Sequence, residues 1–168
     1  MVFGVLQYGK RPYVSFPGGS INVDNYENYL ADFFVDEDFG FEKDVDFFQQ
    51  DGAPAHRALE TLYYLQEFCG DLVMAQDFSK ITSTSPIPEW TPRSPDLNPL
   101  DYFFWGYLKQ CLNKLDGGWP RSEETMKEAI ELICEEMPQD MINNAILDFP
   151  KRCKNCLDRS GGHFEHLL

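Results

Sequence analysis

The sequence predicts an α/β protein in which helices flank a mixed β-sheet, and three observations predict this class. Near Asp51, apolar and β-forming residues give way to an acid and a glycine, and Pro54 then begins a helix expected from Ala55 to Phe68. A second helix is expected after Asn98, because its side chain can cap a helix and a proline follows it. Two β-forming stretches separated by a turn predict a hairpin at the start of the sequence.

The elements of the first half follow from local patterns. The hairpin strands are expected at residues 1–7 and 12–16, and the acidic residues 36–46 are expected to form a solvated loop that leads into the strand before Asp51, with Asp46 inside that strand. Helical spacing predicts that the first helix buries one face, made of Tyr26, Tyr29, Leu30 and Phe33. The helix after Asp51 is expected to turn another apolar set toward the core, namely Leu59, Leu62, Tyr63 and Phe68.

The middle of the chain combines a short strand, a loop and a helix. A buried strand is expected at residues 70–75, and a long proline-containing loop at about 76–93, with Trp90 as its anchor. In the helix after Asn98, Asp101 falls in the first turn. Apolar residues recur there at helical spacing and are expected to face the core: Leu100, Phe104, Leu108 and Cys111.

The last third of the chain is expected to be helical, over about residues 122–157. Ser122 is placed to cap a helix, whose apolar face consists of Met126, Ile130, Ile133 and Met137. A final helix is expected from about Pro138, kinked at Pro150 because proline removes a helix hydrogen bond. A length of 168 residues suits one domain, so residues 1–168 are predicted to form a single domain.

Asp51 and Asp101 are the candidate functional residues that these elements present. Asp51 is expected at the carboxyl end of a strand, where open α/β sheets keep their sites. Each acid also has a simpler explanation. Asp51 with Gly52 is ordinary turn chemistry, and an acid in the first turn of a helix interacts favourably with the helix dipole by a few tenths of a kcal/mol, roughly.

Taken together, the two stretches closely resemble the catalytic domain of mariner-type transposases. They read QQDGAPAH at residues 49–56 and SPDLNPLD at residues 94–101, and the resemblance extends from the hairpin to the tail at residues 161–166. These transposases belong to the DDE/D superfamily and have a ribonuclease H-like fold. The resemblance implies that Asp51 is the second and Asp101 the third of three catalytic acids, close enough to share a metal ion.

The resemblance also implies a cofactor and defines what this sequence lacks. In a complete enzyme, three carboxylates hold two divalent ions about 3.5–4 Å apart, and Mg²⁺ or Mn²⁺ suits such oxygen ligands. His56, Asp96 and Asn98 lie within the motifs and are given supporting roles. The first acid of the family lies on a central strand before the hairpin, so this strand and its acid are expected to be missing. We therefore expect weak metal binding and no activity from the chain alone.

Composition indicates an intracellular protein whose net negative charge is unusual for a protein that acts on DNA. Twenty-eight acids against fourteen bases give a net charge of −14 and a pI near 4.4, whereas DNA-binding surfaces need Lys and Arg. DNA is the partner that the resemblance implies, with weak affinity for this acidic chain alone, and a homodimer is a further option. Five cysteines without a framework fit a reducing compartment. No signal peptide or membrane-spanning run is evident, and a nuclear location is expected.

Several alternatives remain open from the sequence. Two cysteines spaced Cys-x-x-Cys and two later histidines could bind zinc, although core cysteines explain the pattern more simply: Cys153, Cys156, His163 and His166. The chain is either a fragment of a transposase catalytic domain, a domesticated interaction protein without enzymatic activity, or a truncated gene model of a full transposase. Whether it acts as an enzyme is left open.

Overall fold

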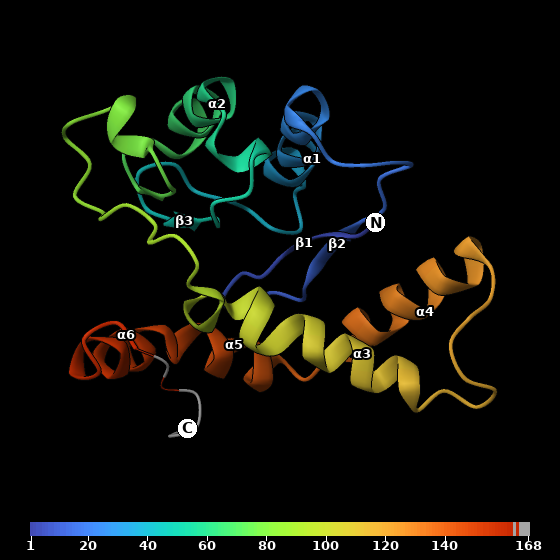
Figure 1. The fold of residues 1–168 in the computed structure, drawn as a ribbon. Helices are drawn as coiled ribbons and strands as arrows, with labels where there is room; N and C mark the ends of the chain where they lie inside the picture. Colours follow the sequence, from blue (N-terminus) through green and yellow to red (C-terminus); the bar gives the residue numbers. More distant parts are fainter. Residues whose placement is uncertain (163, 165–168) are drawn as a thin grey trace. The chain divides into compact units, whose positions relative to one another are not determined.

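The chain folds into short strands and helices in a computed structural model that describes residues 1–162 and residue 164. Figure 1 shows the elements in chain order by colour, and the chain divides into two compact units. Unit 1 comprises Met1 and Pro17–Ser94, and unit 2 comprises Val2–Phe16 and Pro95–Leu168. Within the described residues, none of the helices is both long and apolar enough to cross a membrane.

Unit 1 begins with helix α1, Val23–Val35. A reciprocal pair of bonds begins the helix: the Asn25 amide donates to Asn22 Oδ1 at 3.2 Å, and the Asn22 amide donates to Asn25 Oδ1 at 2.8 Å. These bonds satisfy two backbone donors that a helix start leaves unpaired. The buried face consists of Tyr26, Leu30 and Phe33, which confirms most of the predicted face.

The sheet of unit 1 is a parallel pair, β3 (Phe48–Gln49) and β4 (Val73–Met74). The amide of Gln50 donates to the Met74 carbonyl at 3.1 Å, so the pairing holds the chain to the residue before Asp51. Both strands lie where the sequence predicts them but are shorter. Asp46 is not in the strand as predicted: it lies in a bend before β3, where its Oδ2 accepts the Glu42 amide at 2.8 Å.

The predicted helix Ala55–Phe68 is wrong as a single element. It is a 3₁₀ turn, Ala55–Arg57, followed by helix α2, Leu59–Cys69. Ala58 separates them with extended backbone at φ −64°, ψ 141°, so the helix begins anew at Leu59 and turns a different face inward. The buried residues are Thr61, Leu62, Leu65 and Cys69, whereas two residues predicted to face the core are largely exposed, Leu59 at 50% and Tyr63 at 59%.

The predicted loop after β4 is confirmed, with one short 3₁₀ turn at Phe78–Lys80. Trp90 is buried and donates its amide to the Ala75 carbonyl at 3.3 Å, as expected for an anchor. Asp71 also holds the loop. Its carboxylate accepts a hydrogen bond from the Thr84 hydroxyl at 2.6 Å, and its backbone carbonyl accepts one from the Ser85 hydroxyl at 2.7 Å. Side-chain bonds therefore order this long loop where regular structure is absent.

Unit 2 begins with the predicted hairpin, β1 (Phe3–Val5) paired antiparallel with β2 (Tyr13–Ser15). Its turn is tied to a distant helix, because the Gly9 amide donates to Asn143 Oδ1 at 2.8 Å. One antiparallel and one parallel pair make up the described sheets, so the α/β class is confirmed. A single ribonuclease H-like mixed sheet with a missing central strand stays a prediction.

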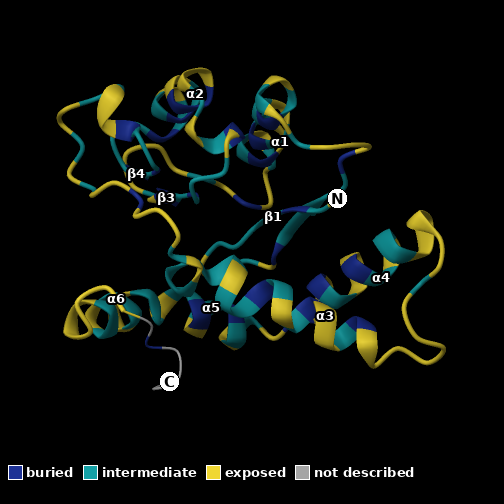
Figure 2. Cartoon of the chain, viewed as in Figure 1, coloured by how far each residue is buried: buried dark blue, intermediate teal, exposed yellow. Residues whose placement is uncertain are grey.

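The helices of unit 2 surround a core that the hairpin helps to cover (Figure 2). They are a π-helix at Leu100–Phe104, α3 at Trp105–Asn113, α4 at Glu123–Glu136, α5 at Gln139–Leu147 and α6 at Phe149–Asp158. The core residues are Phe104, Leu108, Leu112, Ile130, Cys134, Met137 and Ile142. Leu112, four residues beyond Leu108, takes the buried position predicted for Cys111, which is only half-buried.

The ends of these helices follow local chemistry. The Ser122 side chain accepts the Thr125 amide at 3.1 Å, which confirms the predicted cap of α4. The single kinked helix predicted around Pro150 is instead two helices, α5 and α6, which meet at Asp148. Pro150 lacks the N–H needed inside a helix but is tolerated in a first turn, so a new helix begins there.

Replacing Leu62 by alanine tests the corrected register of α2. Leu62 is fully buried, so Leu62→Ala is expected to lower the free energy of unfolding by about 2–5 kcal/mol. The matched change Leu59→Ala removes the same atoms from an exposed position and is expected to cost less than about 1 kcal/mol. Urea unfolding followed by circular dichroism measures both. Equal losses would contradict the observed register.

Candidate active site

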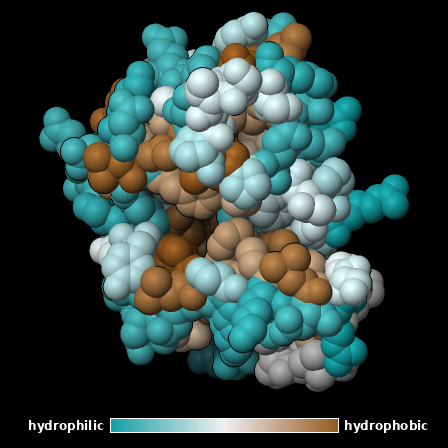
Figure 3. Space-filling view, turned by 90° about the vertical axis from the view of Figure 1, so that its left-hand side faces the viewer, coloured by the Kyte–Doolittle hydropathy of each residue, from teal (hydrophilic) through white to brown (hydrophobic). Residues whose placement is uncertain are grey.

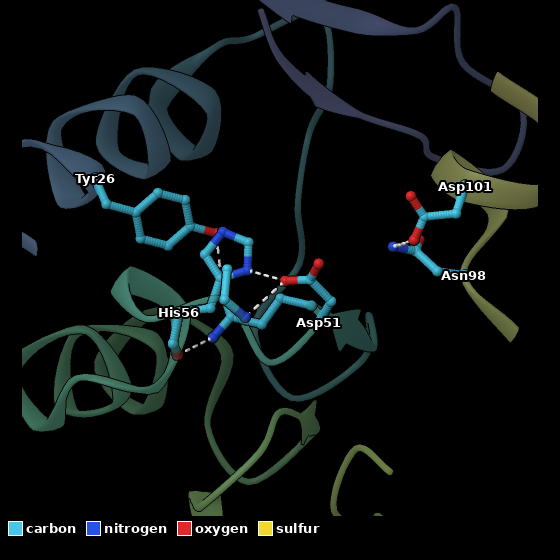
Figure 4. A network of polar contacts seen from close by, with 7 residues as sticks. Tyr26, Asp51, His56, Asn98 and Asp101 are labelled. Carbon is cyan, nitrogen blue, oxygen red and sulfur yellow. Dashed lines mark hydrogen bonds and ion pairs between the residues drawn. The ribbon is translucent and has the colours of Figure 1, made fainter. Parts of the chain in front are cut away.

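Asp51 follows the end of β3 after one residue, Gln50, at the carboxyl end of the strand where the sequence predicts it (Figure 4). Its Oδ1 accepts the amide of Ala53 at 3.0 Å, so the carboxylate closes the turn that follows the strand. A Cβ at Gly52 would meet the end of the Gln76 side chain, which would have to move. The carboxylate is 42% exposed and can therefore meet a ligand from solvent.

His56 makes the second contact to the same carboxylate oxygen. Its Nδ1 lies 2.6 Å from Asp51 Oδ1, and within the described residues no other group accepts a hydrogen bond from this buried nitrogen. The hydrogen bond from His56 lowers the pKa of Asp51, with smaller help from the His56 charge and the Ala53 amide, while desolvation opposes them. Asp51 is therefore kept ionised, as a metal ligand must be.

Asp101 lies in the first turn of the π-helix Leu100–Phe104 and is exposed. Asn98 begins this helix: its Oδ1 accepts the Leu100 amide at 3.2 Å, and its carbonyl accepts the Asp101 amide at 2.9 Å. The Asn98 side-chain amide also donates to Asp101 Oδ2 at 2.9 Å (Figure 4). One side chain thus caps the helix and orients the acid, and π-helical turns are frequent at functional sites.

Arg152 of α6 holds the turn that precedes this helix, a contact that sequence reasoning missed. Its Nη1 donates to the carbonyl of Asp96 at 3.0 Å, and its Nε donates to Asp148 Oδ2 at 2.8 Å. The guanidinium also lies 3.6 Å from the ring centroid of Tyr102. Asp96 therefore takes part through its backbone carbonyl, and the motif turn is joined to α6.

Tyr102 supplies a second link between the motif helix and the last helices. Its hydroxyl donates to the Ala145 carbonyl at 2.6 Å. Burial raises the pKa of Tyr102 to about 12, although the Arg152 charge opposes this, so the phenol keeps its proton and remains a donor. The position of Asp101 within unit 2 is consequently set by contacts on both sides of it in sequence.

The two acids belong to different units, Asp51 to unit 1 and Asp101 to unit 2, so a metal ion shared by both stays a prediction. The donors fit a hard cation such as Mg²⁺, since both are carboxylates and neither Asp51 nor Asp101 is fully buried. Among residues 1–162 and 164, no three His, Cys, Asp or Glu side chains gather closely enough to hold a metal. Of the alternative zinc ligands, Cys153 and Cys156 lie on α6, and His163 and His166 lie outside the described residues.

The fold and the two motif acids define the class: the chain has the fold of a mariner-type transposase catalytic domain. The structure is similar to the catalytic domain of Mos1 mariner transposase, with a TM-score of 0.69, 18% identity, and coverage of 98% of this chain and 83% of that one. The same domain with raltegravir and Mn gives a TM-score of 0.69 at 19% identity, covering 98% and 84% of the two chains. The family resemblance of the sequence is thereby confirmed at the level of the fold.

Assembled Mos1 structures match as well. The mariner paired-end complex with Mn gives a TM-score of 0.67 at 20% identity, and the strand transfer complex gives 0.66 at 21%. These two matches cover 92% and 96% of this chain but only 41% of each Mos1 chain. No protein-family model matches the sequence, and no curated protein matches it either.

Replacing Arg152 by methionine tests the contacts that hold the motif turn. Arg152→Met keeps much of the apolar stem but removes the donor to the Asp96 carbonyl and to Asp148 Oδ2, so we expect a loss of about 1–3 kcal/mol in the free energy of unfolding. The control Lys154→Met changes an exposed residue of the same helix and is expected to stay within about 0.5 kcal/mol of the parent. Chemical denaturation measures both losses. Similar losses of unfolding free energy in the two variants would contradict a stabilising role for the Arg152 contacts.

Proposed function

We propose that this chain is the catalytic region of a mariner-type transposase, forming one ribonuclease H-like domain in which Asp51 and Asp101 bind Mg²⁺ or Mn²⁺. The observation that carries the proposal is the placement of Asp51, immediately beyond a parallel strand and with an ionised carboxylate. Acids at strand ends of α/β sheets are positioned for ligands. The likeness to the Mos1 catalytic domain solved with Mn supports the choice of metal.

The proposed chemistry is the cleavage and joining of DNA phosphodiesters. Divalent ions, when bound, would activate the attacking hydroxyl and stabilise the leaving oxygen. The chain's own residues bind and orient them. Asp51 offers a carboxylate fixed by the Ala53 amide and His56, and Asp101 offers one oriented by Asn98. Both acids are set on ordered turns, which keeps the ligand positions from drifting.

Two acids are expected to hold a metal weakly, because affinity depends on the number and geometry of ligands. Two-ion chemistry in this superfamily uses a third carboxylate, and none of the acids in residues 36–46 lies on a strand next to β3. Asp36, for example, ends α1, and its side chain accepts the Asp38 amide at 2.9 Å. We therefore propose that the 168-residue chain does not cut DNA unaided.

Metal titration with a plasmid assay tests this function. The 168-residue chain is expected to bind Mn²⁺ weakly, measured from the electron paramagnetic resonance of free Mn²⁺, and Asp51→Asn or Asp101→Asn is expected to reduce this binding by about tenfold or more. Neither parent nor variants should nick supercoiled plasmid with Mn²⁺. Addition of an amino-terminal strand that ends in an aspartate is expected to confer nicking that both substitutions abolish.

The control Asp158→Asn removes an exposed acid at the end of α6, with the same change in net charge. It is expected to leave Mn²⁺ binding as in the parent. If all three variants lose equal affinity, the binding is diffuse attraction to an acidic chain, and the proposed site is wrong. Nicking by the parent that Asp51→Asn abolishes would instead show a complete site and overturn the proposed inactivity.

DNA is the proposed partner, in the nucleus, and a homodimer is a further option for the assembly. The chain alone is poorly suited to hold DNA, because 28 acids against 14 bases give it a net charge of −14. Hydrophilic residues occupy much of the face drawn in Figure 3. Mos1 paired-end and strand transfer complexes support an association with transposon DNA. The isolated chain would then depend on further basic surface for firm binding.

A salt titration of duplex binding checks this expectation. By fluorescence anisotropy, the 168-residue chain is expected to bind labelled duplex no tighter than about 10⁻⁴ M at physiological salt, without sequence preference. A duplex carrying a transposon-like inverted repeat and a scrambled duplex should give the same weak curve. Nanomolar binding that distinguishes them would contradict the expectation.

An interaction protein without enzymatic activity is the second candidate, and the surface charge favours it. The exposed side of α4 carries a series of acids, Glu123, Glu124, Glu128, Glu131, Glu135 and Glu136, which could face a basic partner. The metal titration separates the two functions. A pure interaction protein has no reason to bind Mn²⁺ through Asp51 more strongly than through Asp158.

A further inference from the structure

Tyr26 lies behind the candidate site and has no role in the function proposed above. It is on the buried face of α1 with only 2% of its surface exposed, and its ring lies against the His56 ring, with centroids 4.4 Å apart and planes tilted by 31° (Figure 4). A ring contact this close restricts the orientation of the imidazole. An apolar side chain would fill the same space, so the hydroxyl requires its own explanation.

The Tyr26 hydroxyl reaches His56 by a second route, through a buried amide. It donates to Gln50 Oε1 at 2.9 Å, and Gln50 Nε2 donates to the carbonyl of His56 at 2.6 Å. Gln50 is only 6% exposed, so an unpaired amide there would be costly. Burial, with a smaller contribution from the Asp51 charge, raises the pKa of Tyr26 well above its usual value, and the phenol remains a donor.

These two routes hold both the ring and the backbone of His56. The ring then places Nδ1 2.6 Å from Asp51 Oδ1, a distance at which one of the two atoms must carry a proton. A carboxylate accepts hydrogen bonds, whereas an imidazole nitrogen can donate one, so Nδ1 is the donor in this contact. Oδ1 already accepts the Ala53 amide, so two donors engage this oxygen, whereas Oδ2 accepts no hydrogen bond within the described residues.

We propose that Tyr26 is a positioning residue for Asp51: it holds His56 so that the imidazole engages Oδ1 and leaves Oδ2 as the single oxygen that binds a divalent ion. The inference rests on the proposed function for its metal. Partners that orient the ligands of a metal ion typically contribute 10–100-fold to its affinity, roughly. Tyr26 acts one step further away, through His56, and its loss is expected to weaken Mn²⁺ binding by about tenfold.

The proton on Nδ1 gives a readout that does not depend on metal. Two-bond ¹H–¹⁵N correlation of the ¹⁵N-labelled 168-residue chain reports which imidazole nitrogens carry protons, and the His56 signals are assigned by their loss in His56→Asn. In the parent we expect Nδ1 to be protonated. In Tyr26→Leu, which removes both the ring and the hydroxyl, we expect the nitrogen shifts to move toward those of an exposed histidine, whose proton prefers Nε2.

Mn²⁺ titrations of the same chains measure the consequence at Asp51. We expect a large loss for Tyr26→Leu, a smaller one for Tyr26→Phe, which keeps the ring, and parent affinity for Tyr63→Leu, which makes the same change at an exposed position. His56→Asn keeps an N–H donor near the place of Nδ1 and should bind Mn²⁺ more tightly than His56→Ala. This rescue would show that the hydrogen-bond donor to Asp51 Oδ1, and not the bulk of the His56 ring, sets the affinity.

Each outcome decides part of the proposal. The positioning role is wrong if Nδ1 of His56 carries no proton in the parent. It is also wrong if the Tyr26→Leu chain folds and its His56 nitrogen shifts equal those of the parent. If Tyr26→Leu does not fold, Tyr26→Phe is the deciding variant. His56 shifts and Mn²⁺ affinity that both equal those of the parent would then overturn the positioning role. If Asp51→Asn leaves Mn²⁺ binding intact, the metal role of Asp51 is wrong, while the His56 shifts still decide whether Tyr26 controls the imidazole.

Discussion

The buried amide of Gln50 is the interaction on which unit 1 depends most. Its backbone N–H closes the β3–β4 pair at Met74, and its side chain joins Tyr26 of α1 to the carbonyl of His56. The residue therefore connects a helix, a sheet and the turn that carries Asp51. A buried amide is tolerated only where its polar atoms are paired, so these three parts must be in register for the fold to be stable.

Unit 2 uses a charged residue for a comparable purpose. Arg152 joins the Asp96 carbonyl, the Asp148 carboxylate and the Tyr102 ring, and a planar guanidinium is suited to such fixed, multiple contacts. The groups that contact Asp51 and Asp101 directly lie within the two motifs, namely the Ala53 amide, His56 and Asn98. Residues of the surrounding helices, Tyr26 and Arg152, contact the motifs themselves and hold them in place.

Sequence reasoning succeeded where the cause is local. The Ser122 cap, the apolar spacing of α1 and the acid after β3 all depend on neighbours within a few residues. It failed at Ala58, because alanine favours helix and neither glycine nor proline marks the break. It also missed Arg152 and the hydroxyl contact of Tyr26, whose partners Asp96 and Gln50 are 56 and 24 residues away along the chain.

The π-helical turn at Leu100–Phe104 has a consequence for how this stretch can vary in length. A π turn holds one more residue than an α turn, so a single deletion between Asp101 and Phe104 would leave a regular helix without breaking the chain. Each residue of an α-helix turns the chain by about 100°, and the deletion would rotate Asp101 by that angle relative to the buried Phe104 and Leu108. The extra residue therefore sets the direction in which this acid faces, and the length of the stretch is constrained even where its side chains are not.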